Sequence, residues 1–224
     1  MKSLAFHPNI GTFDITDPKV LTFVIENKAF YWKFCAYLYN GFPEHDGFCS
    51  YEDGDKKSAI EDCSLYIANP LDLDLNTKAN LNALYKMLKK RYFGELNGAV
   101  QQIQTELANI CQEIKLDFDA ELEMDAAIRV DDVFKLGGLR FEDNELSFLE
   151  RLTKYVVVAK ELRGISLVFI NHIRDYLDSD QLQEFVKELQ YRGITLINIE
   201  SRMSEEKLAG EIRFIVDQDF CAIS

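Results

Sequence analysis

The stretch GISLVFINHIRDYLDSDQLQEFVKELQYRGITLINIE, residues 164–200, decides the fold of this chain. It begins with a continuous apolar run, Ile165–Asn171, and ends with a second one, Ile194–Glu200. Between them, Asp178 or Ser179 can cap a helix whose apolar residues recur at three- and four-residue steps up to Gly193. A strand, a helix and a strand in this order form a β-α-β unit, which predicts parallel pairing of the two strands in a buried sheet.

Shorter patterns on both sides of this unit predict further elements. Val20–Ile25 is an apolar run fit for a buried strand. The segment 40–55 is rich in Gly, Pro and Asp, which is typical of loops and turns. The remaining expected elements are a helix over 28–39, strands over 64–68 and 139–142, a helix from about 146 to 162, and one or two edge strands within 212–224.

A different pattern fills the middle of the chain. From Thr77 to Ile114, apolar residues form one helical stripe close to a heptad seam, which Gly94 and Gly98 can break or bend into two helices. A further short helix is expected over 126–136. So narrow a stripe favours a helical arm or a dimer contact, with an ordinary pair of core helices as the alternative. We therefore expect an α/β head domain made of residues 1–76 and 140–224, and an inserted α-helical arm domain, residues 77–139.

Composition excludes several classes of protein. The chain has 224 residues and a net charge of −13, which on average repels nucleic acid and acidic membranes and favours a cation or a basic partner. Its five cysteines are widely spaced without a C-x-x-C motif, so neither structural zinc nor a disulfide framework is expected. No apolar run is long enough for a membrane span, and the first residues lack the apolar block of a signal peptide. A cytoplasmic location is expected.

A parallel sheet invites a nucleotide-binding interpretation, but the required loop is missing. A P-loop needs glycines whose N–H groups surround the phosphates, followed by a lysine, and none of the eleven glycines precedes a lysine. The strand ending at Asn171 resembles that of a Walker B motif, with an amide in place of the acidic magnesium ligand. His172 follows directly and is expected to be a structural or surface histidine. No arrangement typical of a hydrolase is present.

The segment Thr77–Gly94 is basic and contains no acidic residue. In an acidic protein this face is either a surface that contacts phosphate groups or simply a solvated helix face. Its cationic residues are Lys78, Lys86, Lys89, Lys90 and Arg91.

The stretch KLDFDAELEMD, residues 115–125, alternates carboxylates with apolar residues. The alternation is typical of a half-exposed edge strand, and acids also favour the start of a helix. A calcium site is the third interpretation, because Ca²⁺ takes six to eight oxygen ligands. The pattern lacks the spacing and central glycine of an EF-hand and leaves all three open.

Several of these segments occur together, and in the same order, in one known family. The chain resembles the Csn2 (Csn-two) family of type II-A CRISPR spacer-acquisition proteins from about Ser64 to the C-terminus, and more weakly before Cys63. The segments that carry the resemblance are NPLDLDLNTKANLNALYKML, the acidic stretch, VFKLGGLRFED, GISLVFIN, QLQEFVKELQYRGITLINIE and VDQDFCAI.

The resemblance implies a head distantly like that of an ABC-type ATPase, without a working nucleotide site, and a helical arm. It implies a homotetrameric ring that threads double-stranded DNA ends through a basic hole, and partners that are the CRISPR integrase and the guide-RNA nuclease. Lys135 and Arg140 would join the basic residues named above around the hole. Calcium, the expected cofactor, would be held collectively by Glu113, Asp117, Asp119, Glu121, Glu123 and Asp125. The strict alternation of the acids departs from the family's arrangement and puts calcium dependence in question.

These observations predict a non-enzymatic, sequence-independent, double-stranded DNA-end-binding ring protein that supports spacer acquisition, since phosphate contacts carry no base information. One alternative is an ATPase-like scaffold that binds neither nucleotide nor DNA and acts through protein contacts. The other is a metal-dependent nuclease. Two-metal sites gather carboxylates from several elements, so five acids in one short segment argue against it.

Overall fold

The chain divides into two compact units. The computed structural model describes residues 2–6, 11–43, 48–53, 56–116, 127–142, 146–219 and 221–223. Unit 1 comprises Met1–Asp74 and Asn144–Ser224, and unit 2 comprises Leu75–Asp143. The domains expected from sequence divide at 76/77 and 139/140. Within the described residues, no helix is both long and apolar enough to cross a membrane.

Unit 1 is built on a six-stranded sheet of order β10-β9-β3-β8-β7-β6. All neighbours pair in parallel except β10, which is antiparallel at the edge. Phe169 lies opposite Ile197 in the pairing of β7 with β8, so the parallel pairing predicted for residues 164–200 is confirmed. The strands are β3 (Val20–Ile25), β6 (Ser64–Ile67), β7 (Leu167–Asn171), β8 (Thr195–Glu200), β9 (Glu211–Val216) and β10 (Ala222–Ile223).

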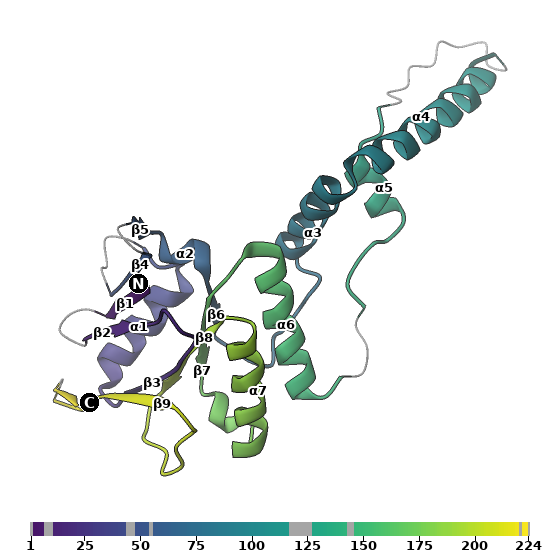
Figure 1. Ribbon diagram of the computed structural model, residues 1–224. Helices are drawn as coiled ribbons and strands as arrows, with labels where there is room; N and C mark the ends of the chain where they lie inside the picture. The colour runs from purple at the N-terminus through teal and green to yellow at the C-terminus, as the bar shows by residue number, and fades with distance from the viewer. Residues whose placement is uncertain are drawn as a thin grey trace. The chain divides into compact units, whose positions relative to one another are not determined.

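Helices cover both faces of this sheet (Figure 1). On one face, α1 (Lys28–Tyr39) buries Phe34 in a cluster with sheet residues such as Phe23. On the other face, α6 (Phe148–Arg163) and α7 (Ser179–Tyr191) bury their apolar sides, including Phe185, in a second cluster. Burying a side chain of this size contributes about 1.5–3 kcal/mol, so the two clusters hold the layers together. A short 3₁₀ turn, η2 (Ile173–Asp175), follows β7.

The ends of α7 are set by local sequence. The Asp178 side chain accepts a hydrogen bond from the Gln181 N–H at 2.9 Å, and Gln181 Oε1 accepts from the Asp178 N–H at 3.2 Å. This capping box makes Asp178, rather than Ser179, the N-cap. Beyond the last turn, Gly193 has φ 71°, a left-handed conformation that glycine adopts without steric cost and that turns the chain into β8. These signals explain why the β-α-β unit is readable from sequence.

Unit 1 also contains a four-stranded antiparallel sheet of order β2-β1-β4-β5. The expectation of loops over 40–55 is wrong for β4, which pairs with β1 and places Phe6 opposite Cys49. The ring of Phe6 lies 4.2 Å, centroid to centroid, from that of Phe23, so this sheet shares the core that contains α1. The elements here are β1 (Lys2–Phe6), β2 (Gly11–Asp14), β4 (Cys49–Asp53), β5 (Lys56–Ser58) and the short helix α2 (Ile60–Cys63).

Glu211, the first residue of β9, lies at the centre of a buried group of charged side chains. The carboxylate of Glu211, whose side chain is fully buried, accepts hydrogen bonds from Thr22 Oγ1 at 2.5 Å, Arg174 Nη2 at 2.8 Å and the Leu208 N–H at 2.9 Å. Arg213 Nη2 lies 3.0 Å from its second oxygen. Glu211 therefore ties β3, η2 and β9 together through one side chain.

In the described part of unit 2, three helices pack on one another: α3 (Lys78–Arg91), α4 (Phe93–Leu116) and α5 (Val130–Leu136). The long stripe is indeed divided into two helices, but the break falls at Tyr92; Gly94 and Gly98 lie inside α4. The strand expected over 139–142 is wrong. The backbone N–H and C=O of Phe141 bond instead to the side-chain amide of Asn76, at 2.8 and 3.1 Å, so this segment is held by a side chain rather than by a neighbouring strand.

Candidate nucleic-acid interface

Helix α3 carries the basic face predicted from sequence. Its start is fixed by Thr77, whose hydroxyl accepts a hydrogen bond from the Asn80 N–H at 3.2 Å. Tyr85 is buried on the side that faces the rest of unit 2, and its hydroxyl donates to the Leu139 carbonyl at 2.9 Å. At about 1.5 Å per residue, the helix presents a basic surface roughly 20 Å long.

Four of the predicted lysines share one side of α3. At about 100° per residue, Lys78, Lys86, Lys89 and Lys90 fall within about 120° of the helix circumference. Arg91 projects from another side of the helix and is exposed. Among the described residues, neither Lys86 nor Lys90 forms an ion pair, and both are exposed, so their charges are available to a ligand.

One acid of α5, Asp131, neutralises part of this charge. Lys89 Nζ lies 3.1 Å from the carboxylate of Asp131. Asp132 lies 3.7 Å from Lys135 Nζ and receives hydrogen bonds from Arg129, which lower the pKa of its carboxyl. The structure therefore pairs Lys89 with an acid of another helix, which spacing along the chain does not reveal, whereas Lys135 pairs with an acid of its own helix.

The segment after α5 carries the last predicted basic residue, Arg140, which is exposed. Its position is set by its neighbours: the Leu139 carbonyl is bonded to Tyr85, and Phe141 to Asn76. The ring of Phe134 lies 5.3 Å from that of Tyr85. Arg140 is thus anchored to the same unit as α3.

Lys115 and Leu116 of the acidic stretch end α4, and residues 117–125 lie outside the described residues. Of the six predicted calcium ligands, Asp117, Asp119, Glu121, Glu123 and Asp125 fall there, and Glu113 is an exposed residue of α4. In the parts of the chain that are described, no three His, Cys, Asp or Glu side chains gather closely enough to hold a metal ion. The predicted calcium site remains a prediction.

The carboxyl end of the parallel sheet in unit 1 holds a polar network. His172 follows β7 and lies between Tyr31 of α1 and Glu200 at the end of β8. Asn171, the residue at the Walker B-like position, donates a hydrogen bond to Tyr66 Oη at 2.7 Å. Burial raises the pKa of Tyr66, which keeps this phenol protonated. At the position where an ATPase needs a magnesium ligand, the amide of Asn171 is committed to a neighbouring phenol.

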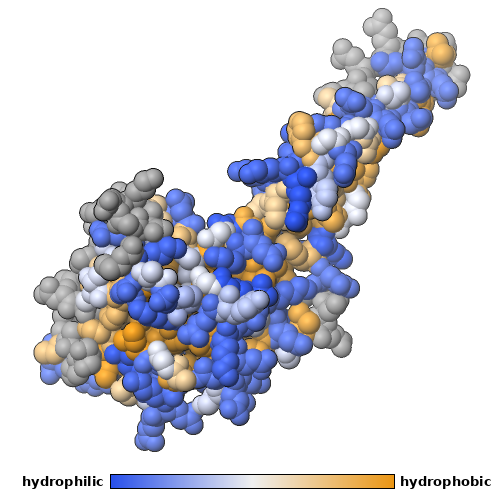
Figure 2. Space-filling view, viewed as in Figure 1, coloured by the Kyte–Doolittle hydropathy of each residue, from blue (hydrophilic) through white to orange (hydrophobic). Residues whose placement is uncertain are grey.

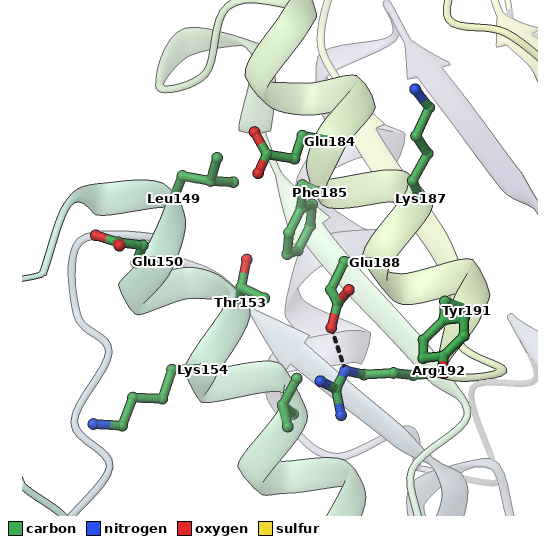
Figure 3. Close-up of a pocket in the computed structure, with 11 residues that line it drawn as sticks. Leu149, Glu150, Thr153, Lys154, Glu184, Phe185, Lys187, Glu188, Tyr191 and Arg192 are labelled. Atoms are coloured by element: carbon green, nitrogen blue, oxygen red, sulfur yellow. Dashed lines mark hydrogen bonds and ion pairs between the residues drawn. The ribbon is translucent and has the colours of Figure 1, made fainter.

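A groove of about 640 Å³ lies between α6 and α7 (Figure 3). Leu149, Val157 and Phe185 give it apolar walls, and Glu188 Oε1 lies 2.6 Å from Arg192 Nε at one end. Acids and bases are balanced around it, so it lacks the positive field that a nucleic-acid backbone requires. Its charged lining residues are Glu150, Glu184, Glu188, Lys154, Lys187 and Arg192.

The fold and the candidate site together define a class of protein. It is an α/β protein with a mostly parallel sheet and no phosphate loop in its sequence, and its separate helical unit carries a basic helix that contains no acidic residue. The family model described as CRISPR-associated protein (Cas_Csn2) matches residues 42–220. The chain belongs to the Csn2 family of CRISPR-associated proteins, which confirms the resemblance seen in the sequence.

A curated relative supports the assignment. The chain is 21% identical over 186 residues to the CRISPR-associated protein Csn2 of Enterococcus faecalis, covering 82% of this chain and 81% of the relative.

Two solved structures are also similar, with TM-scores below 0.5. The ADP conformation of an ATP-binding cassette of an ABC transporter gives a TM-score of 0.42 at 12% identity, covering 91% of this chain and 83% of the other. A putative ABC transporter ATP-binding protein from Pyrococcus furiosus gives 0.38 at 10% identity, covering 94% and 93%. The α/β class of unit 1 rests on its own strand pairing, and its relation to ABC-type ATPases stays a prediction.

Proposed function

We propose that this CRISPR-associated chain is a non-enzymatic, cytoplasmic protein that binds the ends of double-stranded DNA without sequence preference and supports spacer acquisition. The observation that carries the proposal is the basic face of α3. Lys86 and Lys90 are exposed on a helix without a single acid, in a chain whose net charge is −13. Lysines concentrated against such a background create a local positive field suited to a phosphate backbone.

We expect the basic face of α3 to bind DNA through electrostatic attraction alone. Lysine is a flexible point charge that contacts phosphates and carries no base information. The stretch from Lys78 to Lys90 is about 18 Å long at 1.5 Å per residue, roughly half of one turn of B-DNA. One subunit therefore covers only part of a turn, and several subunits around one duplex would supply a continuous set of phosphate contacts.

A homotetrameric ring is the assembly we propose. Its support in this chain is α4, where apolar residues recur at steps of four and three and several remain exposed: Ile103 is 41% exposed and Ile110 is 51% exposed. A seam of this period is buried when a second helix packs against it. Figure 2 shows hydrophobic residues at the surface along this unit. Contacts between copies through α4 would remove this surface from water.

Calcium is the cofactor we propose for unit 2. The carboxylates of residues 117–125, together with Glu113, are hard oxygen donors of the kind that Ca²⁺ prefers. Bound calcium would neutralise their mutual repulsion. The CRISPR integrase and the guide-RNA nuclease are the proposed protein partners.

The test compares affinity for a blunt linear duplex with affinity for a closed circular duplex of the same length, as salt concentration rises. Tighter binding to the linear duplex and a steep decrease with salt are expected. Replacing Lys86 and Lys90 by Glu should weaken binding and flatten the salt dependence. The matched control replaces Lys187 and Lys207, exposed lysines of unit 1, by Glu. Equal binding to both DNA forms, or binding insensitive to salt, overturns the proposal.

Two further outcomes distinguish the alternatives. Failure to bind DNA even with calcium, with no effect of the Lys86 and Lys90 substitutions, would indicate a protein-interaction scaffold. Degradation of linear DNA by purified protein with Mg²⁺ or Mn²⁺ would indicate a nuclease and overturn the proposal that the protein is not an enzyme.

A further inference from the structure

The outer side of α1 exposes large aromatic residues. Its inner side packs on the sheet and buries Phe30 and Phe34. On the opposite side, the side chain of Trp32 is 69% exposed and that of Tyr39 is 77% exposed. Exposed Trp and Tyr on one face of a rigid helix are the residues that most often dominate the binding energy of protein interfaces.

The residues on the outer side of α1 follow a heptad pattern. Ala29, Trp32, Ala36 and Tyr39 are spaced by three, four and three residues, as the a and d positions of a coiled-coil seam. Small and large residues alternate along this seam. Because alanine is small, Ala29 and Ala36 would leave room on either side of Trp32 for side chains from a facing helix.

The flanks of the seam are basic. Lys28 and Lys33 occupy the positions that correspond to g and e, where charges select the partner helix. Both are exposed, and neither pairs with an acid among the described residues. The helix itself, KAFYWKFCAYLY, contains no acidic residue. Within the described part of the chain, this acidic protein thus presents a second basic surface without ion-pair partners, here combined with aromatic side chains.

We propose that the outer face of α1 binds an amphipathic helix of a partner protein that carries aliphatic residues along its seam and glutamates or aspartates beside it. Aliphatic side chains would pack over Ala29 and Ala36, and the acids would face Lys28 and Lys33. The α1 helix of a second copy does not fit, because lysines would then meet lysines. A DNA backbone does not fit either, because it would leave the rings of Trp32 and Tyr39 in water.

This binding is independent of the proposed DNA contacts, since α1 belongs to unit 1 and α3 to unit 2. Burial of the two rings supplies the affinity, because Trp and Tyr each remove about 150–250 Å² from water. The lysines supply the choice of partner, because like charges across a seam are destabilising.

Trp32 provides a direct readout, because it is the single tryptophan of the chain. The probe is a synthetic three-heptad helix with leucines at a and d and glutamates at e and g. Its control is the same peptide with lysines at e and g. Titrating the full-length protein with the glutamate peptide should shift the Trp32 emission to shorter wavelength in a saturable way. The lysine peptide should leave the emission unchanged.

Substitutions separate the two contributions. Trp32→Ala should weaken binding of a labelled glutamate peptide by about tenfold or more, measured by polarisation. Lys28→Glu combined with Lys33→Glu should exchange the preference, so that the lysine peptide binds and the glutamate peptide does not. The control substitutions are Tyr191→Ala and Lys187→Glu on α7, which remove an exposed aromatic residue and reverse an exposed lysine on another helix of unit 1.

The proposal is overturned if both peptides produce the same response, or if neither does. It is also overturned if the Trp32 emission shifts with protein concentration alone, which would assign the face to a second copy. A shift with duplex DNA that the Lys28→Glu and Lys33→Glu changes abolish would assign it to nucleic acid. Failure of this proposal can be distinguished from failure of the proposed DNA binding. Lys86→Glu and Lys90→Glu test DNA binding through α3 and leave α1 unchanged, whereas the peptide titrations test α1.

Discussion

His172 and Glu200 form a hydrogen-bonded pair, with His172 Nδ1 3.2 Å from Glu200 Oε2, at the carboxyl ends of two neighbouring parallel strands. The other ring nitrogen, Nε2, lies 2.7 Å from Tyr31 Oη. Asn198 donates to the second oxygen of Glu200 at 3.0 Å. His172 has φ 50°, a left-handed conformation that is uncommon outside glycine. His172, in this uncommon backbone conformation, therefore connects the end of β7 to β8 through Glu200 and to α1 through Tyr31.

The first prediction is a pH-dependent contribution of His172 to stability. The hydrogen bond with Glu200 raises the pKa of His172 above its ordinary value of 6.5, against burial, which lowers it. Because the pKa is higher in the folded state, the stabilisation is fully present below 6.5 and is lost as pH rises through the folded-state pKa. His172→Asn, which tolerates positive φ, should therefore destabilise the protein more at about pH 5.5 than at about pH 8.5, by up to about 1 kcal/mol in urea unfolding.

A matched control is Tyr31→Phe. It removes the other hydrogen bond of the imidazole and keeps Glu200, so it should lower stability without removing the pH dependence. If His172→Asn lowers the free energy of unfolding by the same amount at both pH values, the pair of His172 and Glu200 does not make stability depend on pH.

The second prediction concerns the buried carboxylate of Glu211. Burial raises its pKa, but hydrogen bonds from Arg213, Thr22 and the Leu208 N–H outweigh this, and the pKa is lowered from 4.5. Glu211→Gln leaves Arg174 and Arg213 without their counter-charge and should destabilise the protein by about 3–5 kcal/mol at neutral pH. The additional stability of wild type over Glu211→Gln is present above pH 4.5 and is lost as the pH falls through the folded-state pKa of Glu211.

The comparison for Glu211 is Glu188→Gln, which removes a half-exposed ion pair with Arg192. Such a pair contributes about 0–1 kcal/mol. Denaturant unfolding of both variants measures the difference, and equal effects would show that burial does not strengthen the Glu211 contacts.

The third prediction uses the ion pair between Lys89 and Asp131. Asp131→Asn frees the Lys89 ammonium for a phosphate, so affinity for duplex DNA should rise and the salt slope should steepen by up to about 0.9. Adding Lys89→Gln should cancel the slope change. Glu106→Gln, which removes an exposed acid of α4, controls for net charge. Identical slopes in Asp131→Asn and wild type would remove Lys89 from the proposed DNA contacts.

The fourth prediction tests the exposed seam of α4. Ile103→Glu together with Ile110→Glu should lower the mass measured by light scattering from that of a tetramer toward that of a monomer. Monomer stability should change by less than about 0.5 kcal/mol per site, because both side chains are at the surface. Gln101→Glu and Gln112→Glu add the same charge on the opposite side of α4 and should leave the mass unchanged.

The fifth prediction concerns calcium. The mass in solution is expected to depend on calcium and to lose that dependence when the five acids of residues 117–125 are replaced by their amides. Calorimetric titration with Ca²⁺ provides an independent readout. Calcium binding that survives all five replacements would place the ion elsewhere.

The sequence alone determined the central part of the fold. Residues 164–200 combine two continuous apolar runs with a capped amphipathic helix, and the structure contains β7, α7 and β8 at those positions. These signals are local, because each depends on residues only a few positions apart. The basic character of α3 was readable for the same reason, since it requires only that one helix contain lysines and no acid. Family membership followed from the order of such segments.

The tertiary structure decided what depends on residues far apart in the chain. The antiparallel sheet of unit 1 was missed because Phe6 meets Cys49 only through folding. The pairing of Lys89 with Asp131 depends on how α3 packs on α5, and the place of His172 between Tyr31 and Glu200 depends on the strand order of the sheet. The aromatic face of α1 belongs here too. Sequence shows that the helix is rich in aromatic residues, but only packing decides that Phe34 is buried while Trp32 is left in solvent.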